Sequence, residues 1–114
     1  MTYIYKIFRQ SEYEAFAAEG RTLGAPIDLA DGYIHFSTAE QARETAAKHF
    51  AGEDGLKVLA VPVDPLGDDV KWEVSRGGAL FPHLYRELRA EDVDWVKDLP
   101  VVDGKHLMDE VLGD

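Results

Sequence analysis

The segment from Asp31 to Thr38 most constrains the fold, because a turn, a strand and a helix start follow one another within it. The dipeptide Asp31-Gly32 is typical of a turn. Residues 33–36 read Tyr-Ile-His-Phe, a short run of β-prone residues. Ser37 and Thr38 come next, and either hydroxyl can cap a helix, because a Glu or Gln stands three residues later in a capping box. The segment therefore predicts a strand that leads directly into a helix.

Two histidines are the strongest candidates for chemistry. His35 lies at the end of this predicted strand, beside a helix N-terminus that suits an anionic or polar ligand group. His83 lies in a second predicted extended segment, at residues 80–85. Because imidazole titrates near neutral pH, we predict that His35 and His83 face one ligand as a general acid–base pair. The alternative is that each ring is a structural hydrogen-bonding partner in a half-buried aromatic wall.

Two further side chains are candidates for the same site. Glu73 lies on the polar face of a predicted strand at 70–74, where a carboxylate can stabilise positive charge or accept a hydroxyl proton. A solvated carboxylate, or an ion pair with a neighbouring lysine or arginine, is the alternative. Ser37 shares a strand face with His35, and no nucleophile-elbow motif surrounds it. We therefore expect Ser37 to bind ligand or to cap the helix.

We expect no metal site. The chain has no cysteine, which excludes a disulfide framework and a thiolate metal site. It also has no His-x-x-x-His pair. His35, Glu73 and His83 together match the ligand types of a two-histidine, one-carboxylate site, but nothing else in the sequence supports that use.

The hydrophobic periodicity predicts an α+β fold, in which a small, twisted, mixed β-sheet carries two main helices, Ser11–Glu19 and Ala39–Phe50. Residues 20–32 contain four glycines or prolines and are expected to form an irregular loop. Residues 103–114 are expected to form one loose acidic helix. The predicted strands are residues 3–8, 56–63, 70–74, 80–85 and 93–96.

Length and charge bound the class of protein. The 114 residues predict one domain, with a core at about residues 3–100 and an acidic tail at 101–114. A net charge of −10 opposes binding to duplex nucleic acid. No apolar run reaches the roughly 20 residues that span a bilayer, and the first residues lack a signal-peptide pattern. We therefore expect a cytoplasmic protein without a membrane partner, a monomer or weak homodimer that binds a small molecule or nucleotide.

Three pieces of the sequence resemble the bacterial DUF952 family. They are Gly-Tyr-Ile-His-Phe-Ser-Thr-Ala-Glu-Gln at residues 32–41, Trp-Glu at 72–73, and Phe-Pro-His-Leu-Tyr at 81–85. The resemblance runs from about Tyr3 to Val96. DUF952 is a domain of unknown function, so the resemblance by itself implies no activity.

DUF952 is distantly similar to the ADP-ribosyltransferase superfamily and its RNA 2′-phosphotransferase relatives. Those proteins bind NAD or an ADP-ribosylated intermediate in a cleft of a split, mixed sheet, so the similarity implies such a cleft here, with NAD as a substrate. His35 and Ser37 match the histidine and hydroxyl residue that contact the nicotinamide ribose, and Glu73 or His83 matches a later catalytic position. The aromatic-then-glutamate order after His35 is missing.

The same similarity extends the expected ligand-binding set. Tyr33 or Tyr85 would stack on a ligand ring, and Thr38 would lie beside Ser37. The arginines of the phosphotransferase branch have no clear counterparts, and Arg76 is the candidate kept for ligand binding.

Two other functional classes remain open. In a two-histidine phosphoesterase, paired His-x-Ser/Thr motifs face each other; His35-Phe36-Ser37 fits one copy, whereas Tyr85 replaces the second hydroxyl residue. In a non-catalytic binding module, the two histidines would only recognise a small ligand.

Overall fold

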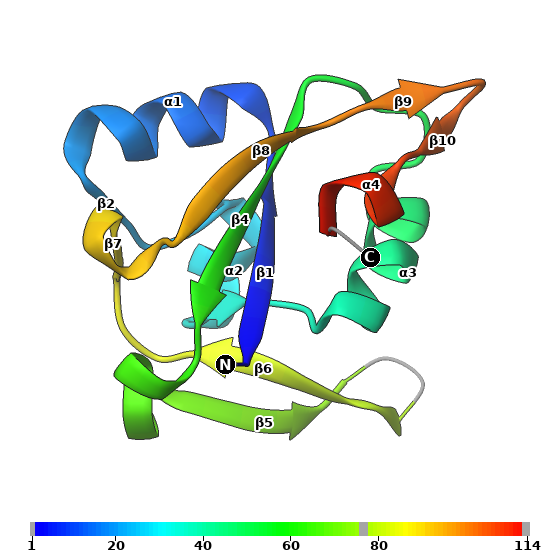
Figure 1. Ribbon diagram of the computed structural model, residues 1–114. Helices are drawn as coiled ribbons and strands as arrows, with labels where there is room; N and C mark the ends of the chain where they lie inside the picture. The colour runs from blue at the N-terminus through cyan, green and yellow to red at the C-terminus, as the bar shows by residue number, and fades with distance from the viewer. Residues whose placement is uncertain (1, 76–77, 113–114) are drawn as a thin grey trace.

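The computed structural model describes residues 2–75 and 78–112. They fold as an α+β protein in which two three-stranded sheets lie against each other (Figure 1). The first sheet has the order β1-β4-β8, with β1 at Tyr3–Phe8, β4 at Leu56–Pro62 and β8 at Trp95–Leu99. The second has the order β3-β6-β5, with β3 at Ile34–His35, β6 at Leu80–Leu84 and β5 at Val70–Val74.

The prediction of one mixed sheet is wrong. Every strand pairing within the described residues is antiparallel, and the strands form separate sheets. Two further sheets are two-stranded: β2 (Arg21–Thr22) with β7 (Leu88–Arg89), and β9 (Val101–Val102) with β10 (Lys105–His106). Strand direction depends on the path of the chain between strands, which the local residue pattern does not encode.

Both expected helices are present, with small shifts of their ends. The first, α1, spans Gln10–Glu19, one residue earlier than predicted, because the Glu12 carboxylate accepts from the backbone N–H of Arg9. The second, α3, spans Ala39–His49 and is capped by Thr38, whose hydroxyl accepts from the N–H of Gln41 at 3.2 Å. The predicted capping box is thus confirmed for Thr38.

A third helix, α2 at Pro26–Asp31, lies where an irregular loop was expected. Pro26 is its first residue, a position where the missing proline N–H costs nothing. The Asp28 carboxylate accepts from the N–H of Ala25 at 2.7 Å, and Gly32 ends the helix with a φ of 85°. The sequence does carry these start and stop signals, in a stretch whose glycine and proline content masks them.

The segment after residue 100 is not one helix. It forms the β9–β10 hairpin and then a short helix, α4, at Met108–Leu112. The turn residues Asp103 and Gly104 both have positive φ, as in a two-residue hairpin turn of type I′. Short 3₁₀ helices lie at Asp64–Asp69 (η1) and Ala90–Asp92 (η3).

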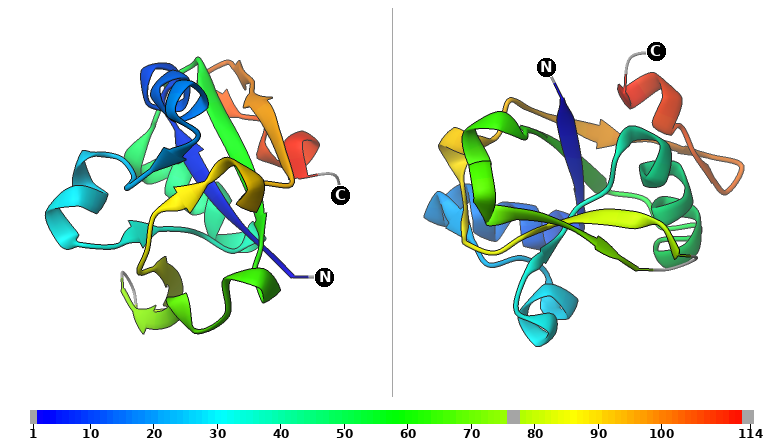
Figure 2. Two further views of the ribbon diagram at one scale, coloured as in Figure 1. Left: turned by 90° about the vertical axis from the view of Figure 1, so that its left-hand side faces the viewer. Right: turned by 90° about the horizontal axis from the view of Figure 1, so that it is seen from below.

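The β1-β4-β8 sheet separates two hydrophobic clusters, as the views in Figure 2 help to follow. One cluster contains Phe8, Phe16 and Leu84, and joins α1 and Ala25, the residue before α2, to the second sheet. The other packs α3 and α4 on the opposite face. The close-packed residues of α3 are Ala42 and Ala46, whose small side chains bring the helix near the sheet. No helix in the described part of the chain has the length and apolar character that crossing a membrane requires.

Candidate functional site

His35 and His83 lie directly opposite each other on neighbouring antiparallel strands. His35 on β3 is the register partner of His83 on β6, so both side chains project from the same face of the sheet. Their ring centroids are 5.3 Å apart, with an edge-to-face angle of 72°. The pairing of β3 with β6 therefore brings together two imidazoles that lie 48 positions apart in the chain (83 − 35).

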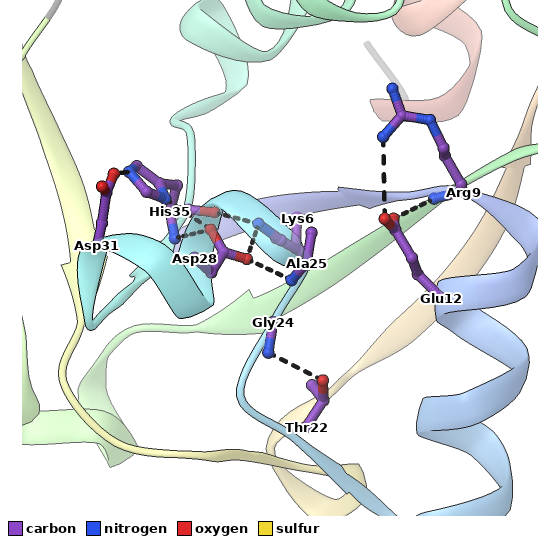
Figure 3. Close-up of polar contacts among 9 residues, drawn as sticks. All are labelled: Lys6, Arg9, Glu12, Thr22, Gly24, Ala25, Asp28, Asp31 and His35. Carbon is purple, nitrogen blue, oxygen red and sulfur yellow. Dashed lines mark hydrogen bonds and ion pairs between the residues drawn. The ribbon is translucent and has the colours of Figure 1, made fainter.

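Asp28 holds His35 in place (Figure 3). Its Oδ1 atom accepts from the backbone N–H of His35 at 3.1 Å and lies 2.5 Å from the ring Nδ1. Its Oδ2 atom accepts from the Lys6 ammonium at 2.6 Å. Burial alone would raise the pKa of Asp28, but the hydrogen bond from His35 and the charge of Lys6 outweigh it and lower that pKa. Asp28 is therefore a buried carboxylate that stays ionised.

Lys6 and Asp28 also explain why the two sheets part. Tyr5 and Ser37 exchange backbone hydrogen bonds of 2.8 and 2.9 Å, which join β1 to the end of β3. If the pairing continued, Ile7 would be the next partner of His35. Instead the N–H of His35 donates to Asp28, and its carbonyl accepts from Lys6 at 3.0 Å. The buried ion pair thus takes the place of a strand partner and ends the ladder.

His83 is held by a second carboxylate. Its Nδ1 atom lies 2.7 Å from Oε1 of Glu73, on the neighbouring strand β5. The same oxygen accepts from the hydroxyl of Tyr85 at 2.7 Å. The hydrogen bonds from Tyr85 and His83 lower the pKa of Glu73, and the bond to Glu73 raises the pKa of Tyr85 to about 12. Glu73 is therefore an ionised acceptor that orients the His83 ring.

The two predicted stacking residues pack on the protein's own rings. Tyr33 stacks on His83 with centroids 4.2 Å apart, and its ring lies 5.1 Å from that of Tyr85. It also lies 4.8 Å from the ring of His35. Tyr33 thus covers the imidazole pair on one side, and a ligand ring would have to stack on an outer face of this aromatic group.

A cavity of about 460 Å³ opens beside the histidines. Ser37 lines it, and its hydroxyl lies 3.0 Å from the hydroxyl of Thr45. The remaining lining residues combine apolar and cationic groups with a few hydroxyls and one carboxylate. They are Tyr5, Lys6, Ile7, Arg9, Ala25, Ile27, Asp31, His35, Phe36, Thr45, His49, Phe50, Ser75, Phe81 and His83.

A larger hollow of about 550 Å³ lies between α3 and the C-terminal segment, away from the histidine pair. Among its polar side chains, Arg43 pairs with Asp109, and His106 contacts the carbonyl of Glu53 at 3.0 Å. Within the described residues, the buried side-chain polar atom without a hydrogen-bonding partner is Nε2 of His83, which lines the other cavity. The smaller cavity is therefore the better candidate.

The structure brings most of the predicted site residues together. His35, His83 and Glu73 form one contact network with the rings of Tyr33 and Tyr85. Ser37 reaches the cavity.

Two predicted ligand-binding residues stand apart from this network. Thr38 is used by the helix cap and does not line the cavity. Arg76 lies outside the described residues.

Sequence reasoning missed the residues that hold His35. Asp28 and Asp31 belong to the unexpected helix α2, and Asp31 Oδ2 lies 3.0 Å from Nε2 of His35. Lys6 lies in an otherwise apolar strand, and a lysine at such a position is a sequence signal for a buried partner. Its side chain is 7% exposed in the structure. In the described parts of the chain, no group of three or more histidines and carboxylates is arranged to hold a metal ion.

Comparison with known protein families shows to which family this chain belongs. The model of DUF952, described as a protein of unknown function, matches residues 7–96. The chain belongs to the DUF952 family. No curated protein matches the sequence. The described DUF952 fold also contains elements beyond the matched range, including the end of β8 and all of α4.

Solved structures of another protein resemble this DUF952 chain closely. The crystal structure of protein CC0527 from Caulobacter crescentus is 51% identical, with a TM-score of 0.93, and the match covers 99% of this chain and 100% of that one. The solution NMR structure of CC0527 is 52% identical, with a TM-score of 0.88, covering 99% and 98% of the two chains.

Proposed function

We propose that this protein is an enzyme that binds NAD or a related nucleotide in the cavity beside His35 and His83, and that these histidines transfer protons there. The observation that carries the proposal is the opposed pair of imidazoles, each oriented by its own carboxylate, at the edge of a cavity. A histidine–carboxylate pair is a usual arrangement for general acid–base catalysis, because the carboxylate fixes the ring's orientation and tautomer.

The cavity supports a ligand of this size and polarity. A volume of about 460 Å³ lies within the ~300–1,000 Å³ range that small-molecule sites occupy. Apolar walls such as Ile27 and Phe81 would contact the rings of a nucleotide, and Ser37 would bind a ribose hydroxyl. The parting of two antiparallel sheets beyond Tyr5 and Ser37 is compatible with an ADP-ribosyltransferase-like cleft, which is an argument from fold analogy.

The proposal assigns Glu73 a different role from the one implied by that superfamily. Because its Oε1 atom accepts from both His83 and Tyr85, Glu73 is better suited to orienting His83 than to contacting a cation-like transition state directly. Direct contact with the substrate then falls to the two histidines and Ser37.

The test begins with thermal shifts in NAD, ADP-ribose and AMP. A ligand present at 100 times its dissociation constant adds ~2.7 kcal/mol of stability, or on the order of 10 °C in Tm for a domain of this size. Release of nicotinamide from NAD is then measured for the native protein and for His83→Phe. We expect a ~10²–10⁴-fold loss of rate in the variant. The absence of both binding and nicotinamide release across nucleophilic acceptors would overturn the proposal.

A second candidate is a two-histidine phosphoesterase, which the direct opposition of His35 and His83 favours. Against it, Tyr85 stands where the second motif needs a Ser or Thr, and its hydroxyl donates to Glu73. Hydrolysis of a 2′,3′-cyclic nucleotide that disappears in His35→Ala would favour this candidate over the first.

A further inference from the structure

The two imidazoles of the site differ in their hydrogen bonding. His35 faces a carboxylate at each nitrogen, with Nδ1 2.5 Å from Asp28 and Nε2 3.0 Å from Asp31. The Nδ1 contact with Asp28 is a hydrogen bond, and the Asp31 carboxylate lies at ion-pair distance from Nε2. Both nitrogens of His35 therefore already face a carboxylate of the protein.

His83 has the opposite arrangement. Glu73 is ionised and can only accept, so the hydrogen of the 2.7 Å contact belongs to Nδ1 of His83. The hydroxyl of Tyr85 donates to the same oxygen, so Glu73 acts as acceptor in both contacts. In the neutral ring Nε2 then carries the lone pair. The carboxylate thus makes Nε2 the hydrogen-bond acceptor of the ring.

Nε2 of His83 is buried and has no hydrogen-bonding partner among the described residues. The His83 side chain is only 3% exposed, yet the residue lines the cavity. Leaving a buried acceptor unsatisfied costs ~1–3 kcal/mol, and native proteins do so rarely, most often at functional sites or where a bound molecule completes the set. The missing partner is a hydrogen-bond donor, and the cavity that His83 lines is the space from which we expect it to approach.

We infer that Nε2 of His83 is the atom at which the cavity receives a hydroxyl group, and that His83, not His35, accepts the proton of that hydroxyl during the reaction. The second part rests on the proposed function. In this step the O–H bond breaks as an N–H bond forms at Nε2, and the electron pair stays on the oxygen, which becomes a stronger nucleophile. The positive charge that develops on His83 lies beside the Glu73 carboxylate.

The hydroxyl has two possible sources, a sugar of the ligand or a water molecule that enters with it. ¹⁵N-labelled protein distinguishes them. If ADP-ribose supplies the hydroxyl, it shifts the Nε2 resonance of His83 on binding, and a deoxyribose analogue lacking the relevant hydroxyl does not. If water supplies the hydroxyl, ADP-ribose and the deoxyribose analogue give the same Nε2 resonance of His83. The rate of NAD cleavage still falls in His83→Phe.

The tautomer of the free protein is the decisive measurement, because it does not depend on the ligand. Long-range ¹H–¹⁵N spectra of the neutral ring should give His83 a protonated Nδ1 and a bare Nε2. A protonated Nε2 with a bare Nδ1 in His83 overturns the inference, even if NAD binds. If the tautomer is as inferred and no nucleotide binds, the proposed ligand class fails and the acceptor assignment stands.

Stability of the variant gives an independent readout. His83→Phe keeps a ring but removes the unsatisfied acceptor. Glu73→Leu removes the carboxylate and leaves both His83 nitrogens without a partner. Without ligand, we therefore expect the Tm of His83→Phe to be no lower than that of Glu73→Leu. If the sugar supplies the hydroxyl, His83→Phe should bind ADP-ribose at least tenfold more weakly, whereas His106→Phe, outside the cavity, should bind it within about twofold of the native protein. Equal ADP-ribose affinity in His83→Phe and the native protein would exclude the sugar as the source, and an unchanged rate of NAD cleavage in His83→Phe would contradict proton transfer at Nε2.

Discussion

His35 and His83 are direct register partners across two antiparallel strands, and each is oriented by a carboxylate from a different element. Asp28 reaches His35 from helix α2, and Glu73 reaches His83 from strand β5. A change in either carboxylate should therefore alter one imidazole first. The predictions below use this separation.

The buried pair of Lys6 and Asp28 should contribute strongly to stability. Asp28→Asn leaves the ammonium of Lys6 buried without its counter-charge, which should lower the free energy of unfolding by ~3–5 kcal/mol. Adding Lys6→Met to that variant should restore part of the loss, because the uncompensated charge is then gone. Urea unfolding of the single and double variants measures the coupling.

An exposed pair of the same residue types provides the control. Lys57 pairs with Asp98, whose side chain is 79% exposed. Asp98→Asn should therefore change the free energy of unfolding by ~1 kcal/mol or less. Equal losses in Asp28→Asn and Asp98→Asn would contradict the structural role given to the buried pair.

Asp28 should also make folding sensitive to acid. Its pKa is lowered in the folded state, so its contribution to stability is fully present above the unfolded value of about 3.9 and is lost as pH falls through the folded pKa. Between about pH 5 and pH 2 the Asp28 carboxyl takes up a proton more readily in the unfolded chain than in the folded one. The native protein should therefore lose stability more steeply with falling pH than Asp28→Asn does. Free energies of unfolding at a series of pH values give both slopes, and parallel slopes would count against this pKa shift.

Gly24 should be intolerant of any side chain. Its φ is 103°, and a Cβ atom there would clash with the side chain of Asp28. Gly24→Ala should therefore displace Asp28, lower the Tm and shift the ¹⁵N resonances of His35. Gly32→Ala is the matched control, because Gly32 also has positive φ but its Cβ would meet open space. That variant should lose only the ~1–2 kcal/mol of backbone strain, with His35 unchanged.

Tyr85 should report on Glu73 at high pH. Its pKa is raised to about 12 by the hydrogen bond to Glu73, so its hydroxyl should ionise later than an ordinary tyrosine. In Glu73→Leu the pKa of Tyr85 should return toward about 10. Carbon-13 NMR of the tyrosine rings, assigned with Tyr85→Phe, resolves this residue from the others. A Tyr85 that titrates alike in both proteins would mean that the bond to Glu73 is absent in solution.

The sequence was most informative where a local repeat fixes the direction of side chains. The two-residue alternation correctly separated Glu73 from its neighbours Trp72 and Val74, but these apolar neighbours are 42% and 69% exposed, and the face that carries Glu73 is the one that contacts His83. The meeting of His35 with His83 could only be hypothesised, because strand order is not a local property. Asp28 was overlooked for the same reason, since its partners Lys6 and His35 lie 22 and 7 positions away.

The C-terminal segment was misjudged from its charge. We expected one loose acidic helix over residues 103–114, but Met108 and Val111 are 2% and 4% exposed and pack with Ala42 and Ala46. A net charge describes the average of a segment, whereas two well-spaced apolar side chains are enough to anchor it.

The burial of Met108 and Val111 has a practical consequence for anyone preparing this domain. A fragment trimmed to residues 7–96, the part recognised by the family model, would strip the cover from the sheet-facing cluster beside α3 and cut through strand β8. The family model thus marks a shorter piece than the packed structure, and boundaries of an expressed domain are better drawn from that packing.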